Sequence, residues 1–162
     1  DGQHWYISYG GNTPFTLVND SSYRIPNLRF GDFNGDGKTD VFGSGSKYWQ
    51  VSNSATGGWA ALQPRLTDTV TNLIIADFNG DGQADVATIS ISTLSTVTWK
   101  VSYSGMGNWS NLRSDSINQK YAAIGRFDGN RSTDILFWHD KYLDISANGA
   151  GAQQRQSRQD MR

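Results

Sequence analysis

Residues Asp32 to Asp40 read D-F-N-G-D-G-K-T-D, and residues Asp77 to Asp85 read D-F-N-G-D-G-Q-A-D. In both nine-residue loops, oxygen-bearing side chains stand at positions 1, 3, 5 and 9, and a main-chain carbonyl is available at position 7. Calcium takes about six to eight hard oxygen ligands of this kind. Glycine at position 6 permits the positive φ that the chain needs to wrap around an ion. The two loops therefore predict two calcium sites.

Other interpretations of the two loops remain open at this stage. Asn, Asp and Gly are common turn formers, so the loops could be turns without metal. Magnesium is disfavoured because it demands a tighter octahedral shell. An EF-hand or a dockerin-like loop would need an acidic twelfth residue, but Gly43 and Thr88 stand there, and the residues after position 9 favour a strand.

The loops lie inside a longer repeat. The sequence W-Y-I-S at Trp5 recurs as W-Q-V-S at Trp49, as W-K-V-S at Trp99 and, weakened, as L-D-I-S at Leu143, with spacings of 44, 50 and 44 residues. Each of the first three copies is followed by a second aromatic residue about ten positions later. Four short strands in roughly 45 residues is typical of a β-propeller blade.

The repeat predicts an all-β fold of about 3 to 3.5 blades, each with four antiparallel strands, across residues 1–162. The expected boundaries are a half blade at 1–20 and blades at 27–63, 71–113 and 121–162, with the last strand near Ser157 to Arg162. The extra residues of the middle period, between Asp85 and Trp99, predict a lengthened hairpin. Since a closed propeller needs at least about four blades, we expect either a fragment of a larger propeller or assembly with another chain.

A third loop, at residues 126–134, reads R-F-D-G-N-R-S-T-D. A cation occupies the first ligand position, and Arg131 replaces the glycine of position 6. The guanidinium of Arg126 could take the place of the ion and pair with Asp128 and Asp134. We expect no calcium in this loop.

These residues resemble the FG-GAP repeat of integrin α-subunit propellers and its bacterial and fungal relatives, often called VCBS repeats. The resemblance extends from Trp5 to about Ser146, and Phe30-Gly31 is similar to the family's F-G step. It implies structural calcium and a propeller of more blades than this chain holds, for example seven. It also implies the following ligands, with Lys38 and Gln83 acting through their carbonyls: Asp32, Asn34, Asp36, Lys38, Asp40, Asp77, Asn79, Asp81, Gln83 and Asp85.

Composition limits the classes of partner. All fifteen acidic residues are Asp, which favours turns and metal loops over helices. A net charge of −1 gives no general reason to bind nucleic acid, and no apolar stretch approaches the length of a membrane span. We expect a secreted protein whose signal lies upstream of Asp1 or was removed.

No catalytic constellation stands out, so the expectation is a protein that is not an enzyme. His4 and His139 are the only histidines, and no G-x-S-x-G elbow is present. The repeating tryptophans are expected to pack between blades, which leaves Tyr23, Tyr121 and Trp138 as candidates for a ligand surface. The first hypothesis is a lectin-like module that binds a glycan. The alternatives are an adhesion scaffold that binds an extracellular protein and an accessory propeller of a secreted enzyme.

Overall fold

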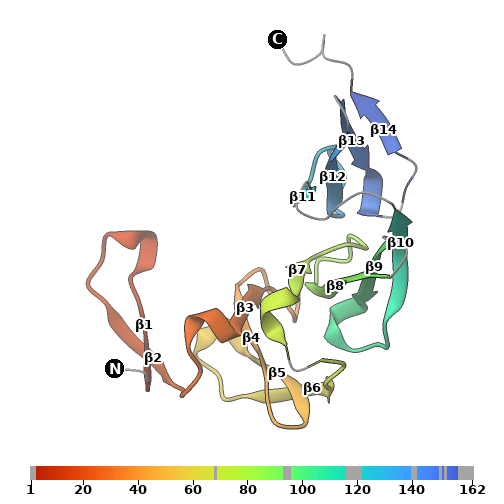
Figure 1. Cartoon of the computed structure of the whole chain (residues 1–162). Coiled ribbons are helices and arrows are strands. Elements are labelled where there is room, and N and C mark those ends of the chain that lie inside the picture. The colour runs from red at the N-terminus through yellow and green to blue at the C-terminus, as the bar shows by residue number, and fades with distance from the viewer. Residues whose placement is uncertain are drawn as a thin grey trace.

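A computed structural model describes residues 3–67, 69–92, 96–115, 122–139, 142–149, 151 and 153–156 of the chain. These residues form four antiparallel sheets that follow one another along an open arc (Figure 1). The helices among them are 3₁₀ turns of three residues each, and none is long or apolar enough to cross a membrane. The prediction of an all-β fold built from blade-like sheets is confirmed.

Within each sheet, strands that are consecutive in the chain pair with one another, as the repeat predicts. The first sheet has only two strands, β1 (His4–Ile7) and β2 (Thr16–Asp20). The second contains β3 (Leu28–Gly31), β4 (Asp40–Ser44), β5 (Tyr48–Ser52) and β6 (Ala60–Pro64). The third contains β7 (Ile74–Ala76), β8 (Asp85–Ile91), β9 (Val97–Ser102) and β10 (Ser110–Asp115). The fourth contains β11 (Ala122–Gly125), β12 (Asp134–His139), β13 (Tyr142–Ser146) and β14 (Gln153–Gln156).

Two strand predictions have different outcomes. The lengthened hairpin is confirmed, because β8 and β9 stay paired as far as Ile91 and Val97. The last strand was placed wrongly: β14 pairs with β13 through Gln153–Gln156, before the predicted segment at Ser157 to Arg162, which lies outside the described residues. The fourth copy of the repeat lacks the second aromatic residue that precedes this strand in the earlier copies, so no residue marked where the strand begins.

A 3₁₀ turn follows the third strand of each four-stranded sheet and also follows β1, which corresponds to a third strand by its place in the repeat. Another 3₁₀ turn precedes the first strand of the second and third sheets. The turns after the third strands are η1 (Tyr9–Gly11), η3 (Asn53–Ala55), η5 (Tyr103–Gly105) and η7 (Ala147–Gly149). The turns before the first strands are η2 (Ile25–Asn27) and η4 (Val70–Asn72). Each turn of the first group contains a residue with positive φ, which returns the chain toward its own sheet.

The hydrophobic core lies between the sheets. One cluster joins Phe42 and Trp49 of the second sheet to Leu73 and Val86 on the third-sheet side. The other joins Trp99 of the third sheet to Ile135 and Phe137 of the fourth. Trp49 and Trp99 are almost completely buried, so the expectation that these repeating tryptophans pack in the core is confirmed.

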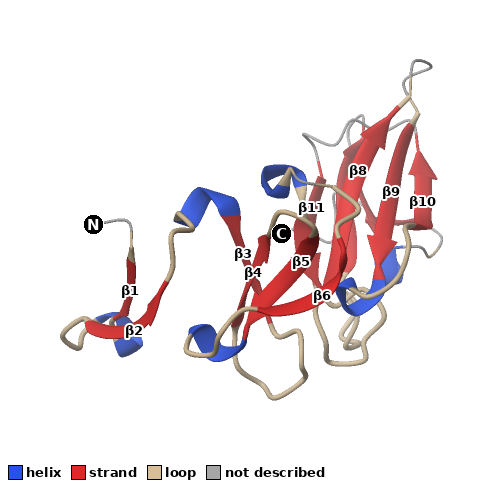
Figure 2. Cartoon of the chain, turned by 90° about the horizontal axis from the view of Figure 1, so that it is seen from below, coloured by secondary structure: helices blue, strands red, loops and turns tan. Residues whose placement is uncertain are grey.

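In the second and third units, the second aromatic residue packs backwards onto the preceding sheet. The Trp59 ring meets Trp5 edge to face at 5.6 Å between centroids, and Trp109 meets Trp49 at the same distance. Such pairs add about 0.5–1.5 kcal/mol each beyond the area that they bury. Figure 2 shows the result from below: the sheet of β8–β10 stacks beside that of β5 and β6, while β1 and β2 stand at one end of the row.

Equivalent side-chain hydrogen bonds join the first sheet to the second and the second sheet to the third. Asn19 of β2 donates through Nδ2 to Ser52 Oγ at 3.1 Å, and Gln63 of β6 donates through Nε2 to Ser102 Oγ at 3.2 Å. Both serines are completely buried. On β5, Trp49 and Val51 are buried in the core, and Ser52 is buried as well because the preceding sheet contacts it through Asn19.

Candidate functional site

The first acidic loop folds around the side chain of Asp32. Asp32 Oδ1 accepts the N–H of Gly35 at 2.7 Å, and Oδ2 accepts the N–H of Gly37 at 2.8 Å. Asn34 Oδ1 accepts the N–H of Asp36 at 2.9 Å, and Asp36 Oδ1 accepts the N–H of Lys38 at 2.8 Å. Gly35 and Gly37 both have positive φ, as so tight a loop requires. The structure thus gathers positions 1, 3 and 5 at an exposed rim.

Asp40, at position 9, lies away from this rim and has no exposed surface. Its Oδ2 accepts the N–H of Phe33 at 2.9 Å, and its Oδ1 accepts the N–H of Ser54 at 2.7 Å. Ser54 belongs to the 3₁₀ turn η3. Asp40 therefore joins the loop to the turn that follows the third strand, and we call this arrangement the base of the loop.

The second loop repeats both layers. At the rim, Asp77 Oδ1 accepts the N–H of Gly80 at 2.6 Å, Asn79 Nδ2 donates to Asp81 Oδ2 at 2.8 Å, and the N–H of Gln83 donates to Asp81 Oδ1 at 2.7 Å. At the base, Asp85 accepts the N–H of Phe78 at 2.8 Å and of Ser104 at 2.8 Å. The contacts of the two loops correspond position by position.

Burial raises the pKa of Asp85 from 3.8 to about 6. The N–H groups of Ser104 and Phe78 oppose this rise, whereas the carboxylates of Asp81 and Asp77 add to it. Negative charge in this loop therefore disfavours ionisation of Asp85, and a cation at the rim would favour it.

The ten predicted ligand residues lie in two separate loops, one set in each. Among the described residues, no group of three or more acidic, histidine or cysteine side chains lies close enough together to hold a metal ion. A calcium site here thus depends on Asn34 and Asn79 and on main-chain oxygens in addition to carboxylates. The rim oxygens already accept N–H groups of their own loop, and each oxygen keeps a second lone pair.

The third loop keeps the base and changes the rim. Asp134 has no exposed surface and accepts the N–H of Phe127 at 2.7 Å and of Asn148 at 3.0 Å. At the rim, Asn130 Nδ2 donates to Asp128 Oδ2 at 2.6 Å, and Ser132 Oγ donates to Asn130 Oδ1 at 2.7 Å. An amide and hydroxyl network thus takes the place of the first-position carboxylate.

The predicted role of Arg126 was wrong. Its side chain is exposed, and no ion pair joins it to Asp128 or Asp134, all three of which are described. The oxygens of Asp134 instead accept the main-chain N–H groups of Phe127, Asp128 and Asn148.

The loops of neighbouring sheets are also joined directly. The N–H of Ala84, at position 8 of the second loop, donates to the carbonyl of Asp32 at 2.6 Å. The N–H of Thr133, at position 8 of the third loop, donates to the carbonyl of Asp77, again at 2.6 Å. Sequence reasoning missed these contacts and the base contacts of Ser54 and Ser104, because they use main-chain atoms; their only signal is the constant spacing of the repeat.

A polar cavity of about 310 Å³ opens beside Tyr23, the one non-repeating aromatic candidate whose side chain the structure describes. Its lining includes Asn27, Ser44 and Thr71. The Tyr23 hydroxyl donates to the carbonyl of Ser44 at 3.2 Å and accepts from Gln50 Nε2 at 3.0 Å. Ser44 Oγ is buried without a hydrogen-bond partner in the described structure. Tyr121 and the side chain of Trp138 lie outside the described residues.

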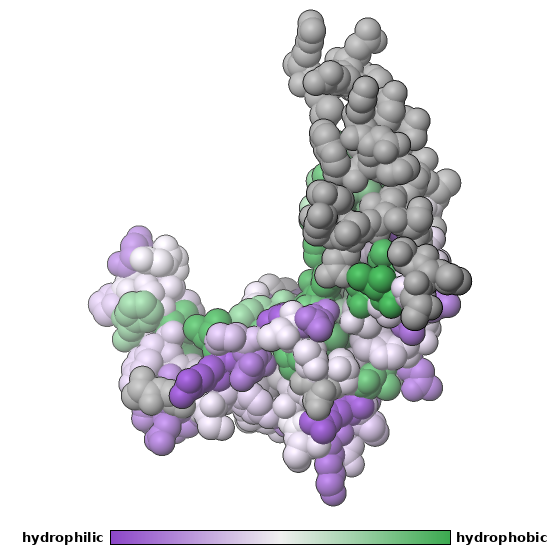
Figure 3. Space-filling model, in the orientation of Figure 1, coloured by the Kyte–Doolittle hydropathy of each residue, from purple (hydrophilic) through white to green (hydrophobic). Residues whose placement is uncertain are grey.

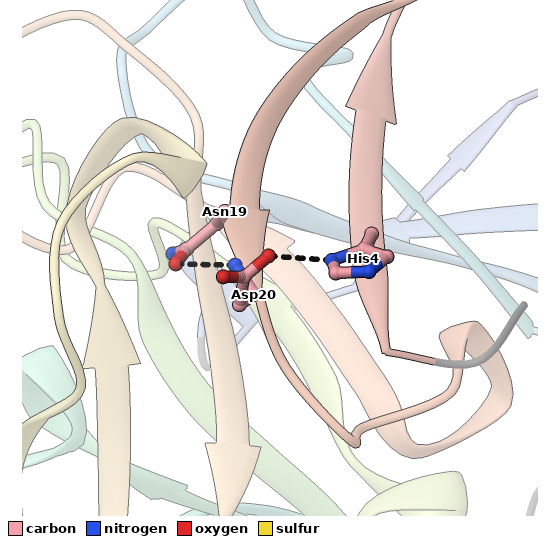
Figure 4. Close-up of polar contacts among 3 residues, drawn as sticks. All are labelled: His4, Asn19 and Asp20. Atoms are coloured by element: carbon pink, nitrogen blue, oxygen red, sulfur yellow. Dashed lines mark hydrogen bonds and ion pairs between the residues drawn. The ribbon is translucent and has the colours of Figure 1, made fainter.

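His4, one of the two histidines, contacts Asp20. Its Nδ1 lies 2.6 Å from Asp20 Oδ1, across the pair that closes β1 onto β2 (Figure 4). Asn19 Oδ1 in turn accepts the N–H of Asp20 at 2.8 Å. The side chains of His4 and Asp20 are 37% and 76% exposed, so water screens the contact. His139 ends β12 and pairs with Tyr142 across the hairpin to β13.

The comparisons with known proteins agree with the repeat. The family model of the FG-GAP-like repeat matches residues 32–88, and no curated protein matches the chain. The matched segment begins at Asp32 of the first loop, includes the second loop and ends within β8. Residues 32–88 of this chain are therefore an FG-GAP-like repeat.

Proposed function

We propose that this chain is part of a secreted, non-catalytic recognition module that binds carbohydrate and whose blades are stabilised by calcium. The FG-GAP-like repeat supports a recognition or adhesion module of the propeller type. The observation that carries the choice of carbohydrate is the cavity beside Tyr23, because it combines an aromatic ring with an unpartnered buried hydroxyl.

The lining of this cavity suits a sugar. Sugar rings present many hydroxyl groups around a compact apolar face, and binding sites for such ligands place a few polar groups around an apolar wall. Asn27, Ser44 and Thr71 supply amide and hydroxyl groups, while Tyr23 and Val70 supply apolar surface. A volume of about 310 Å³ lies near the lower end of the ~300–1,000 Å³ typical of ligand pockets, so we expect a terminal sugar unit to fit.

The position of Tyr23 links the cavity to the fold. Its ring packs against Trp59 at 5.0 Å between centroids, and its hydroxyl joins β4 to β5 through Ser44 and Gln50. The cavity is bounded by residues of the second sheet and by η4, which precedes the third sheet. Any change in how these two sheets stack would alter the site.

Calcium has a structural role in this proposal. The loops at 32–40 and 77–85 supply the hard oxygens that calcium prefers, and the loop at 126–134 lacks a carboxylate at position 1. An ion at the rim would compensate the charge of the three carboxylates in each complete loop. It would also stiffen the carbonyls of Asp32 and Asp77, which accept hydrogen bonds from the next sheet.

A glycan array probed with the protein in calcium-containing buffer tests the proposal. We expect saturable binding to one class of sugar. The variant Ser44→Ala should weaken that binding about tenfold, because a hydrogen bond of about 1 kcal/mol or somewhat more is lost. Ser46→Ala is the matched control, since Ser46 is exposed and absent from the cavity lining.

Absence of binding to every glycan with calcium present would overturn the choice of carbohydrate and favour the protein-binding adhesion scaffold. Equal binding by Ser44→Ala and the unaltered protein would show that a sugar binds elsewhere. Chelation provides a separate test of the calcium role, considered below.

A further inference from the structure

The hydrogen bonds between the acidic loops of neighbouring sheets follow one pattern. At the second and third interfaces, the position-8 N–H of one acidic loop donates to the position-1 carbonyl of the preceding loop, at 2.6 Å in both cases. Ala84 and Thr133, which donate these bonds, are each only 6% exposed. The acceptor loop thus covers the donor residue.

Thr39 occupies position 8 of the first loop, and no preceding acidic loop packs over it. Its residue is exposed, and its N–H has no hydrogen-bond partner among the residues that the structure describes. The two-stranded sheet of β1 and β2, which precedes this loop, contains no counterpart of the first two strands of a blade or of the loop between them.

The main-chain N–H of Gly10 is a second donor without the partner that its counterparts have. Ser54, Ser104 and Asn148 follow the third strands of their sheets with φ of 52°, 50° and 55°, and each donates its N–H to a position-9 aspartate. Gly10 holds the same place after β1, with φ of 66°. No carboxylate accepts its N–H among the described residues. The turn after β1 thus has the backbone conformation that, in the other three sheets, donates an N–H to an aspartate.

An apolar groove of about 530 Å³ lies between the first two sheets, and Thr39 is part of its lining. Its walls include Trp5 and Ile7 from β1 and Leu28, Phe30 and Val41 from the next sheet. Figure 3 shows hydrophobic surface, in green, running from the β1–β2 hairpin at the left toward the centre of the molecule. Trp5 and Ile7 are half-buried, whereas Trp49 and Val51, their counterparts on β5, are almost completely buried.

Ala55 also lines the groove. At the equivalent position of the next two interfaces, an aromatic ring packs against the turn. At the next interface, Phe33 of the first loop lies 3.7 Å from the Cβ position of Gly105, the counterpart of Ala55. At the one after it, Phe78 lies 3.2 Å from that of Gly149. The position-2 phenylalanine of each of the first two loops therefore packs beneath the turn of the following sheet.

We propose that this groove is a docking surface for a β-hairpin of the repeat's own type, in which two apolar strands flank a nine-residue loop with Phe at position 2 and Asp at position 9. The hairpin pairs with the free edge of β1, its position-1 carbonyl accepts the N–H of Thr39, and its position-9 carboxylate accepts the N–H of Gly10. The groove continues the pattern of two interfaces that already exist within the chain. A second copy is a poorer occupant, because each described strand of this type is already paired in its own sheet. The proposal is independent of sugar binding.

The test adds a synthetic peptide with the sequence of residues 28–44 to the full chain, in calcium-containing buffer, and follows binding by calorimetry and amide hydrogen exchange. This peptide contains the counterparts of both missing strands and the loop between them. We expect saturable binding with one peptide per chain. Exchange at the amides of Gly10 and Thr39 should slow by about tenfold or more, because both N–H groups gain acceptors.

Two matched comparisons separate specific docking from adhesion of an apolar peptide. A peptide with Asp40→Ala should bind at least about tenfold more weakly and should leave the Gly10 amide unprotected. In the protein, Ile7→Lys places a charge in the groove and should abolish binding. Ile91→Lys alters an isoleucine that is 62% exposed on the third sheet, outside the groove, and should bind the peptide normally.

The proposal is overturned if the peptide does not bind, if the Asp40→Ala peptide binds equally well, or if protection appears away from Gly10 and Thr39. Dimers of the chain that dissociate on Ile7→Lys would also overturn it, since a second copy would then fill the groove.

Discussion

The loops at 77–85 and 126–134 share their bases and differ at their rims. In both, a fully buried aspartate at position 9 accepts the N–H of position 2 and of the turn after the third strand. At the rim, Asp77 accepts the N–H groups of Gly80 and Gly82, whereas the third loop uses the Asn130 and Ser132 network. One layer of the repeat is constant while the other varies.

This difference separates two roles that the acidic pattern combines. The base joins the loop to its own sheet in all three copies, so it serves the fold whether or not an ion is bound. The rim supplies the carboxylates that calcium would need, and it is complete in only two copies. Position 9 is therefore a structural position first, and its value as a calcium ligand comes second.

The strongest test of this separation is the loss of a base aspartate from the loop without a calcium rim. Asp134→Ala removes the acceptor of the Phe127, Asp128 and Asn148 N–H groups. Each buried donor left without a partner costs about 1–3 kcal/mol. We expect a loss of about 3 kcal/mol or more in the free energy of unfolding, measured by urea denaturation with excess calcium present.

Asp128→Ala is the matched control for that experiment, because Asp128 lies at the exposed rim of the same loop. Its loss should cost less than about 1 kcal/mol. If Asp134→Ala destabilises the protein no more than Asp128→Ala does, then the base is not the constant structural layer.

Removal of calcium should have the next largest effect. We expect EDTA to lower the melting temperature clearly, because an ion that binds only the folded state stabilises it by about 2.7 kcal/mol per site at hundredfold excess over its Kd. Calorimetric titration should give two sites, and Asp36→Ala or Asp81→Ala should each leave one. Asp128→Ala should leave both. An unchanged melting curve in EDTA would refute structural calcium.

Ionisation of Asp85 should make the calcium-free protein sensitive to pH. Because its folded pKa is raised from 3.8 to about 6, the contribution of this group to stability is complete below about pH 4 and is lost as the pH rises through 6. The expected loss between pH 5 and pH 7 is about 1 kcal/mol. Urea denaturation in EDTA at both pH values measures it, with Asp85→Asn as the control that should lack the change.

Restoring the third rim should create a site where none is expected. The double variant Arg126→Asp and Arg131→Gly recreates the pattern of the first two loops at positions 1 and 6. Calorimetric titration should then give three sites. Two sites in this variant would show that Asn148, which contacts Asn130 and Ser132, still closes the rim.

The sequence could predict the strands, the buried tryptophans and the two classes of loop, because all of these depend on side chains that recur at a fixed spacing. It could not predict the shared role of Ser54, Ser104 and Asn148, since these residues act through the main-chain N–H and not through the side chain. Nor could it predict the direction of Arg126, whose long side chain points to solvent. The start of β14 was missed because Gln153 stands where the earlier units have an aromatic residue.

The smallest effect is expected where an acidic side chain lies outside any loop. Asp20 meets His4 at the end of the two-stranded sheet, and both side chains are substantially exposed. Exposed pairs of this kind contribute about 0.2–1 kcal/mol, so His4→Ala should lower the free energy of unfolding by less than about 1 kcal/mol. A loss as large as that of Asp134→Ala would mean that the first sheet depends on this contact in place of its missing inner strands. Addition of the hairpin peptide should then offset much of the loss, because pairing along β1 would hold the strand independently of His4.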